Sequence, residues 1–173
     1  MSTSLLYHAF GIRGYTYLKS EYEDGKVIFT IGQERDDLRC SVCGSRRVLR
    51  RGFQSRLFRS LPIGTRAVQV VLDVPRIGCM DCGTVRQVDV DFADERRSYT
   101  KAFERYVLEL SRHMTIQDVA EHLQVGWDLV KDIQKRYLSK RFRRIKLKRL
   151  RQIVIDEICI GRGHRYLSAD RQA

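Results

Sequence analysis

The chain has 173 residues, a hydrophobic content of 43% and a formal net charge of +12, which indicates a folded, basic protein of one ordinary domain or a few small ones. No apolar run approaches the roughly 20 residues that a membrane span needs, which argues against a membrane protein. The amino terminus lacks a basic stretch followed by a long apolar core, which argues against a secretory signal. We therefore expect a cytoplasmic protein whose cysteines stay reduced.

The positive charge is concentrated in two blocks. Residues 39–72 contain eight arginines and no acid, and residues 96–151 contain 16 basic and 6 acidic residues. Such blocks could coat a membrane surface or only keep the protein soluble. A polyanion such as DNA is the favoured partner, because each phosphate that a basic side chain neutralises releases counterions and so favours binding.

Two β-hairpins are predicted in the first half of the chain. The first covers residues 14–31, in which two β-prone runs flank the turn signal Asp24-Gly25. In the second, a strand over residues 67–74 alternates apolar with other side chains, and Pro75 is expected to end it. The other predicted parts are a partner strand at residues 57–61, a turn at 62–64, a short strand at 84–90 and an acidic linker at 89–95.

Two nearly identical cysteine motifs bracket the second hairpin. A Cys-x-x-Cys turn points two thiolates at one ion, and the glycine that follows each turn tolerates a positive φ. Redox dithiols or disulfides are the alternatives, but the duplicated motif favours a closed tetrahedral site, which suits zinc better than iron. The motifs are Cys40-Ser-Val-Cys43-Gly44 and Cys79-Met-Asp-Cys82-Gly83, so the predicted ligands of a structural Zn²⁺ are Cys40, Cys43, Cys79 and Cys82.

Arginines are frequent between the two cysteine motifs, and seven of them lie within residues 46–66. A small zinc module of this kind usually binds nucleic acid or a partner protein rather than catalysing a reaction. Its arginines either contact phosphates, which we favour, or are only solvated. They are Arg46, Arg47, Arg50, Arg51, Arg56, Arg59 and Arg66.

The second half of the chain is predicted to be helical. Apolar residues over 103–114 fall on one helical face, with Thr100 as the N-cap. Residues 115–137 then match a helix-turn-helix, because the capping-box pair Thr115 and Asp118 opens a first helix and a three-residue turn leads to a second. The expected buried residues of the second helix are Val130 and Ile133, together with Trp127 and Tyr137.

The outward face of this second helix is the candidate base-contacting surface, because the second helix of the motif enters the major groove. The alternative is an ordinary helical hairpin with a solvated polar face. Residues 140–151 follow, with eight basic residues in twelve and no acid, and form either a solvated face or, as we favour, a phosphate-binding extension. The predicted DNA-binding residues are Asp128, Lys131, Gln134, Lys135, Arg141, Arg143, Arg144, Lys146 and Lys148.

A β-branched strand is predicted at residues 152–160, with the acidic pair Asp156-Glu157 in its middle. A carboxylate on such a strand is how two-metal phosphoryl-transfer enzymes hold Mg²⁺. One aspartate does not support that chemistry, and only Glu157 and Asp170 follow it. Cys159 has no partner at metal-ligand spacing and is expected to be a buried thiol.

In this order, these parts resemble the N-terminal portion of an ISL-family insertion-sequence transposase, over about residues 5–168. The resemblance implies an RNase H-like domain that cuts and joins DNA ends through an Asp-Asp-Glu triad, with Mg²⁺ in full-length relatives. Asp156 matches the first Asp of that triad, and the second Asp and the Glu have no counterpart here. Beside the cysteine motifs, the resemblance rests on Leu61-Pro62-Ile63-Gly64, Phe103-Glu104-Arg105, Val119-Ala120-x-x-Leu123, Ile155-Asp156-Glu157 and Gly163-His164-Arg165-Tyr166-Leu167.

The expected fold class is α+β: a small β-rich zinc ribbon, then an all-α helix-turn-helix domain and one strand of an incomplete RNase H-like domain. Relatives continue the last strand with apolar residues, whereas residues 168–173 are mostly polar, so the resemblance predicts a truncated copy. The predicted boundaries are 1–38 for the N-terminal β-hairpin, 39–90 for the zinc ribbon, 98–151 for the helix-turn-helix with its basic extension and 152–173 for the truncated catalytic domain.

The sequence is thus interpreted as a transposase fragment that binds double-stranded DNA at terminal inverted repeats and is itself inactive, with Asp156 vestigial. We expect it in the bacterial cytoplasm on the nucleoid, away from membranes, with full-length transposase as a further partner. Two alternatives remain. One is a stand-alone DNA-binding regulator, such as a repressor of the element, and the other is a catalytic subunit that another chain completes.

Overall fold

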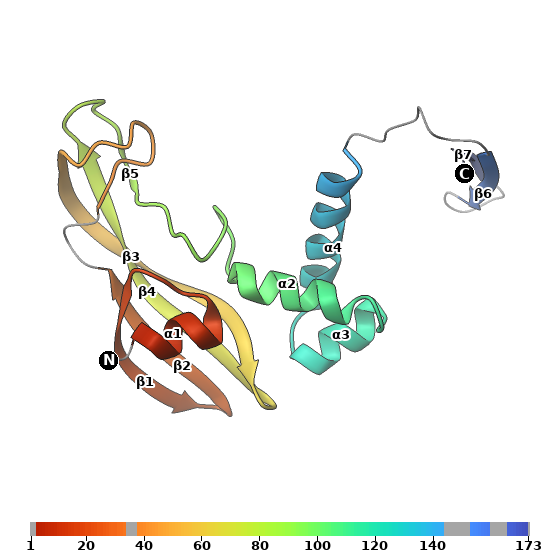
Figure 1. The fold of residues 1–173 in the computed structure, drawn as a ribbon, viewed down its shortest axis with the longest axis horizontal. Coiled ribbons are helices and arrows are strands. Elements are labelled where there is room, and N and C mark those ends of the chain that lie inside the picture. Colours follow the sequence, from red (N-terminus) through yellow and green to blue (C-terminus); the bar gives the residue numbers. More distant parts are fainter. Residues whose placement is uncertain (1–2, 34–37, 144–152, 160–165, 173) are drawn as a thin grey trace. The chain divides into compact units, whose positions relative to one another are not determined.

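The computed structural model describes residues 3–33, 38–143, 153–159 and 166–172, and for residues 3–5 and beyond 152 it describes the backbone alone (Figure 1). The chain divides into two compact units, Met1–Gln134 and Lys135–Ala173. In chain order, the elements are α1 (Thr3–Phe10), β1 (Tyr15–Glu23), β2 (Lys26–Gln33), β3 (Val48–Ile63), β4 (Arg66–Cys79), β5 (Val85–Gln87), α2 (Lys101–Leu110), α3 (Ile116–Leu123), α4 (Trp127–Arg141), β6 (Ile153–Cys159) and β7 (Tyr166–Gln172).

The first five strands form one sheet in the order β1-β2-β4-β3, with β5 paired to β4. The hairpin predicted at residues 14–31 is confirmed as the antiparallel pair β1 and β2. This hairpin does not stand apart from the ribbon, because β2 runs parallel to β4, with Val27 opposite Val68 and Ile31 opposite Leu72. An isolated hairpin is marginally stable, and this pairing lets the apolar side of β2 join a larger core.

One face of the sheet is covered by α1, which the sequence analysis did not predict, and by residues 88–93. Phe10 of α1 lies 5.5 Å from Phe29 between ring centroids. Phe92 packs edge-on against Phe58 of β3, with the ring centroids 5.1 Å apart. The acidic segment predicted as a linker therefore belongs to the core, because its apolar residues alternate with its acids and are buried. They are Val88, Val90, Phe92 and Ala93.

The hairpin of β3 and β4 extends further than predicted, up to the cysteine motifs. Pro75 was expected to end the strand but lies inside β4, opposite Phe53. A β-bulge between Arg50 and Phe53 interrupts the ladder next to this pair, and a proline without an N–H is tolerated where the ladder is irregular. The carbonyl of Pro75 also accepts a hydrogen bond from the Val88 N–H at 3.0 Å.

Helices α2, α3 and α4 form the predicted helix-turn-helix with its preceding helix. The Thr100 hydroxyl accepts a hydrogen bond from the Phe103 N–H at 3.1 Å and so caps α2 as expected. Thr115 and Asp118 form a reciprocal capping box at the start of α3, and Gln124 ends that helix in the left-handed conformation. The helices share a core of Tyr99, Phe103, Val107, Val119, Ala120, Leu123, Val130 and Ile133.

Two aromatic residues of α4 differ from expectation. Val130 and Ile133 are buried as predicted, but Trp127 is 42% exposed and Tyr137 is 38% exposed. The core that the helices share contains the rings of Tyr99 and Phe103 but not those of Trp127 and Tyr137. Among the described residues, no helix has both the length and the apolar character of a membrane span.

The second unit contains a two-stranded antiparallel sheet. The strand predicted at residues 152–160 is found as β6, and β7 pairs with it along its whole length. β7 continues through the mostly polar residues 168–172. The helices and sheets together confirm the α+β class.

The capping box generates a prediction about stability. Thr115→Ala should lower the free energy of unfolding by about 1 kcal/mol, because the Asp118 N–H loses its acceptor at 3.2 Å. Urea unfolding with zinc present, followed by the fluorescence of the single tryptophan, measures the change. Thr65→Ala, in an exposed turn, is the control and should stay within about 0.5 kcal/mol of wild type. Equal losses in the two variants would contradict the capping role.

Candidate metal centre and nucleic-acid interface

The four predicted metal ligands converge on one point. The Sγ atoms of Cys40, Cys43, Cys79 and Cys82 all lie within 4.8 Å of one another. The Cys40–Cys82 distance is 3.6 Å and the Cys43–Cys79 distance is 3.5 Å. Four sulfurs around one zinc, with bonds of about 2.3 Å, lie about 3.8 Å apart, whereas a disulfide needs about 2.05 Å. The geometry fits four thiolates on one Zn²⁺ and does not fit two disulfides.

The two cysteine turns are built in the same way. The Gly44 N–H donates to the Cys40 carbonyl at 2.9 Å, and the Gly83 N–H donates to the Cys79 carbonyl at 3.1 Å. Gly44 has a φ of 72° and Gly83 a φ of 67°, the positive values that the sequence predicted. With four protein ligands, the site has no open coordination position, which is typical of a structural metal rather than a catalytic one.

Asp81 joins the two turns outside the cysteine cluster. Its carboxylate accepts a hydrogen bond from Arg47 Nη1 at 2.8 Å and another from the Ser45 hydroxyl. The Arg47 carbonyl in turn accepts from the Met80 N–H at 2.9 Å. Arg47, one of the seven predicted phosphate contacts, is therefore engaged within the metal site.

The two exposed cysteines differ in acidity. Hydrogen bonds with the Thr84 side chain and backbone lower the pKa of Cys82 to about 6. At Cys43 the Ser45 backbone acts in the same direction, but hydrogen bonds with Cys79 and the other thiols raise its pKa to about 12. Close thiols compete in this way, because one thiolate makes the next harder to form. A divalent cation resolves the competition, since it favours the thiolate at every ligand.

Helix α4 presents the predicted DNA-contacting residues of the helix-turn-helix. Asp128, Lys131 and Lys135 are exposed, and Gln134 is half-buried. The Lys131 ammonium lies 4.6 Å from the Trp127 ring centroid. Of the other predicted contacts, Arg141 and Arg143 are exposed. The remaining three, Arg144, Lys146 and Lys148, lie outside the described residues.

Trp127 is a candidate that the sequence analysis assigned to the core. It is the first residue of α4, and the residues at the start of a recognition helix are those that contact base edges. Its exposed ring and the neighbouring Lys131 therefore belong to the candidate interface. The position of Trp127 directly after the turn could have identified it as an interface residue. Its hydrophobicity, taken alone, predicts a core residue instead.

Arg59 of β3 connects the sheet to the helix-turn-helix. Its Nη2 donates to the Leu123 carbonyl at the end of α3 at 2.7 Å, and its guanidinium lies 5.6 Å from the Phe103 ring centroid. Its backbone bonds the segment before α2, because the Thr100 N–H donates to the Arg59 carbonyl at 2.9 Å. Burial lowers the pKa of Arg59. This arginine, predicted as a phosphate contact, holds α3 against the sheet instead.

Asp156 lies in β6, where its register partner in β7 is Ala169. Glu157 is opposite Ser168, and Asp170 is opposite Ile155. Within the described strands, no acidic residue is therefore paired with Asp156. The side chains of β6 and β7, including the thiol of Cys159, lie outside the described part of the chain.

Comparison with known proteins finds two matching families. The family described as "Helix-turn-helix domain of transposase family ISL3" matches residues 88–138. The family described as "zinc-finger of transposase IS204/IS1001/IS1096/IS1165" matches residues 37–82. These ranges contain α2, α3 and most of α4 in one case, and all four converging cysteines in the other.

Two transposases illustrate the similarity. The transposase for insertion sequence element IS1557 of Mycobacterium tuberculosis is 34% identical over 132 residues, which cover 75% of this chain and 30% of that transposase. The transposase for insertion sequence element IS1001 of Bordetella parapertussis is 29% identical over 129 residues, which cover 73% of this chain and 31% of that transposase. The chain thus matches less than a third of the length of these relatives. No solved structure matches the chain.

The cysteine geometry predicts one zinc ion per chain. Cys43→Ser should abolish stoichiometric zinc, and a chelator should unfold the ribbon, because metal binding in such small modules contributes the folding free energy. Elemental analysis and circular dichroism measure the two effects. Ser41→Ala, an exposed non-ligand of the same turn, is the control and should keep its zinc. The interpretation is wrong if the purified protein holds no zinc and its four thiols form disulfides.

Proposed function

This chain carries the zinc ribbon and the helix-turn-helix domain of ISL3-family transposases, and we propose that it binds double-stranded DNA at the ends of an insertion sequence. The observation that carries the proposal is the arrangement of α3 and α4. Val130 and Ile133 anchor one side of α4 in the core, while Lys131 and Lys135 face solvent. A helix held on one side and basic on the other suits insertion into the major groove.

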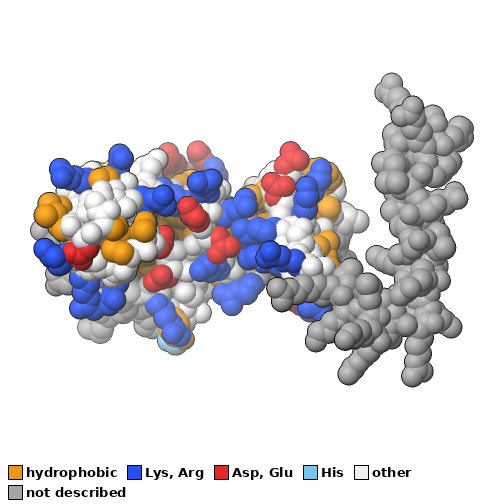
Figure 2. All heavy atoms as spheres, turned by 90° about the horizontal axis from the view of Figure 1, so that it is seen from above, with side chains coloured by type: hydrophobic (Ala, Val, Ile, Leu, Met, Phe, Trp, Pro, Cys, Tyr) orange, Lys and Arg blue, Asp and Glu red, His pale blue; other side chains and the backbone are white. Residues whose placement is uncertain are grey.

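The charge of the chain supports a polyanionic partner. The formal net charge is +12, and on the face drawn in Figure 2 Lys and Arg side chains are distributed over much of the described surface. Phosphate contacts from such side chains supply affinity without sequence information, whereas contacts to base edges supply sequence preference. We assign the first role to the basic run from Lys140 to Arg151 and the second to the outward side of α4.

The structural zinc and Arg59 support this function indirectly. The zinc would fix the two cysteine turns at one end of the hairpin of β3 and β4, and Arg59 of the same hairpin holds the end of α3. A recognition helix must be held rigidly to select one sequence, because loosely placed contacts lose their discrimination. The ribbon thus serves as the support on which the helix-turn-helix is mounted.

We propose terminal inverted repeats as the target and the bacterial nucleoid as the place of action, because both named relatives are transposases for insertion sequence elements. A polypeptide of these residues that occupies the repeats would compete with a full-length transposase for the same DNA. This competition would make it a repressor of the element. The DNA-binding fragment and the regulator are thus two interpretations of the same binding event, and they differ only in its consequence for the element.

We further propose that a polypeptide of these 173 residues does not cut DNA. Two-metal catalysis needs several carboxylates around the Mg²⁺ ions. In the described strands, the register partner of Asp156 is Ala169, which has no carboxylate. Asp156 matches the first triad residue only by resemblance. Its role in this polypeptide would be limited to the stability of β6.

The division of roles generates a prediction about binding. Replacing Arg143, Arg144, Lys146 and Lys148 by alanine should weaken binding to all duplexes alike. It should also lower the slope of log K against log salt by roughly 0.9 per lost phosphate contact. Replacing Lys131 and Gln134 by alanine should instead reduce discrimination by about 1–3 kcal/mol per lost base contact and leave the slope nearly unchanged. Salt titrations with the element's end and a scrambled duplex measure both.

The control for these variants is Lys26→Ala, at the exposed start of β2, which should bind like wild type. If the basic-run variant loses selectivity while the α4 variant loses only salt dependence, the two roles are reversed. If neither variant binds more weakly than wild type, residues 115–151 are not the DNA-binding surface.

The catalytic proposal has its own test. Incubation of the 173-residue polypeptide with a terminal-repeat duplex and Mg²⁺ or Mn²⁺ should give no strand cleavage or joining. Asp156→Ala should leave DNA affinity unchanged. Metal-dependent cleavage that disappears in this variant would show that the carboxylate is functional, and would support a catalytic subunit that another copy or chain completes.

A further inference from the structure

We propose that the end of the sheet next to the cysteines is a second DNA-binding surface, which contacts duplex that flanks the site of the helix-turn-helix. This ribbon-tip surface consists of exposed residues at the adjoining ends of three strands. They are Leu49, Arg50, Arg51, Arg76, Val85 and Arg86. The inference rests on the proposed function and adds that the zinc ribbon contacts DNA itself, beyond supporting α3 and α4.

The strand register places the apolar part of this surface in one row. Leu49 of β3 is opposite Gly78 of β4, and Gly78 is opposite Val85 of β5. The side chain of Arg51 lies over the glycine, since a Cβ on Gly78 would be 3.4 Å from Arg51 Nε and 3.7 Å from Val85 Cγ2. Because Gly78 has no side chain, Arg51 lies flat over this strand, beside the apolar side chains of Leu49 and Val85.

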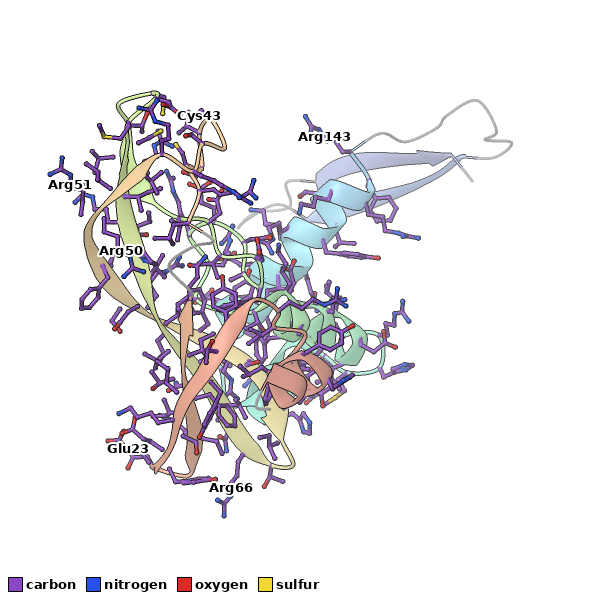
Figure 3. All side chains as sticks on the ribbon, turned by 60° about the vertical axis from the view of Figure 1, so that its left-hand side comes forward. Glu23, Cys43, Arg50, Arg51, Arg66 and Arg143 are labelled. Atoms are coloured by element: carbon purple, nitrogen blue, oxygen red, sulfur yellow. The ribbon has the colours of Figure 1, made fainter. Side chains whose placement is uncertain are left out.

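Arg50 and Arg51 are both exposed and directly precede the β-bulge. Arg50 is opposite Ile77 in the ladder, whereas Arg51 lies over Gly78, so the two arginines take opposite faces of this end of the sheet. Between Arg50 and Phe53, β3 advances by three residues while β4 advances by two, and Gly52 has a φ of 89°. The ribbon-tip surface thus presents positive charge on both sides of the end of the hairpin. Figure 3 shows Arg50 and Arg51 on the half of the hairpin that carries Cys43, with Arg66 at the opposite end.

The charge of the ribbon-tip surface is not neutralised within the described chain. Arg47 forms a surface ion pair with Asp81, and Arg56 and Arg59 donate to backbone carbonyls, so these three arginines have partners within the chain. By contrast, none of the surface's arginines forms an ion pair with an acid in the described residues. They are Arg50, Arg51, Arg76 and Arg86. Exposed positive charge of this density attracts a polyanion.

The apolar residues fit DNA better than the alternatives. Leu49 is 50% exposed, Val85 is 45% exposed, and Phe53 beyond the bulge is 69% exposed. Apolar side chains between arginines match a groove of duplex DNA, where thymine methyl groups and sugars lie between rows of phosphates. A second copy of this chain would bring the same arginines face to face, and like charges across an interface oppose association.

The test compares two duplexes. The short one is the shortest sequence that wild type selects from a random pool, and the long one extends it by about 10 base pairs, one helical turn, on each side. Arg50→Gln with Arg51→Gln removes two charges from the ribbon-tip surface. Lys19→Gln with Lys26→Gln, both exposed and outside that surface, removes two charges elsewhere and is the matched control. Zinc content and urea unfolding verify that every variant is folded.

We expect wild type to bind the long duplex about tenfold more tightly than the short one, and the ribbon-tip variant to lose this gain. Its salt slope on the long duplex should fall by about 1.8, which corresponds to two phosphate contacts. The control variant should keep both the gain and the slope. Leu49→Ser with Val85→Ser should reduce the gain without a change in slope, which separates the apolar contacts from the charged ones.

Three outcomes decide against the inference, and they are distinguishable. If wild type does not prefer its selected duplex to a scrambled one, the helix-turn-helix proposal fails and the inference fails with it. If wild type is selective but the ribbon-tip variant retains wild-type affinity for the long duplex, the inference alone fails. If that variant instead changes the sedimentation coefficient of the DNA-free protein with unchanged DNA affinity, the surface joins two copies of the chain, and the inference is wrong.

Discussion

Convergence of four thiols from two distant turns is the constraint on which the rest of the first unit depends. Cys40 meets Cys82 and Cys43 meets Cys79 across separations of 42 and 36 residues, and each turn is closed by its own backbone hydrogen bonds. The β3 and β4 strands leave this cluster as a paired hairpin, so a metal there fixes their register at one end. A small β-sheet with a thin core gains most from such a constraint, because apolar burial alone stabilises small domains weakly.

One residue of the sheet, Arg59, connects the constrained hairpin to the helices. Arg59 lies on the hairpin that begins at the cysteines, and its guanidinium meets the last carbonyl of α3. Burial of this side chain is costly, because its charge is desolvated and its Nε has no hydrogen-bond partner in the described chain. A buried charge of this kind contributes orientation more than stability. Its value here is that α3 docks in one position, which fixes the direction from which α4 can approach DNA.

The sequence predicted those features that follow from local spacing. Each Cys-x-x-Cys turn, the N-cap of α2, the capping box of α3 and the helix-turn-helix depend on residues a few positions apart in the sequence. The errors concern contacts distant in sequence. Pro75 continues a strand because a bulge in β3 opposes it, and Phe92 belongs to the core because Phe58 lies beneath it. Trp127 is exposed because, at the start of α4, it lies outside the core that the helices share.

The arginine block shows why composition predicts a partner but not a contact. Residues 39–72 hold eight arginines, which are equivalent as contributions to net charge. In the folded chain, Arg47 forms an exposed ion pair with Asp81 beside the metal site, and Arg59 is half-buried and donates to the end of α3. Arg50, Arg51 and Arg66 are exposed, but they lie at different ends of the β3 and β4 hairpin. The proposed binding to DNA would therefore depend on where the strands place each arginine, and not on the number of arginines alone.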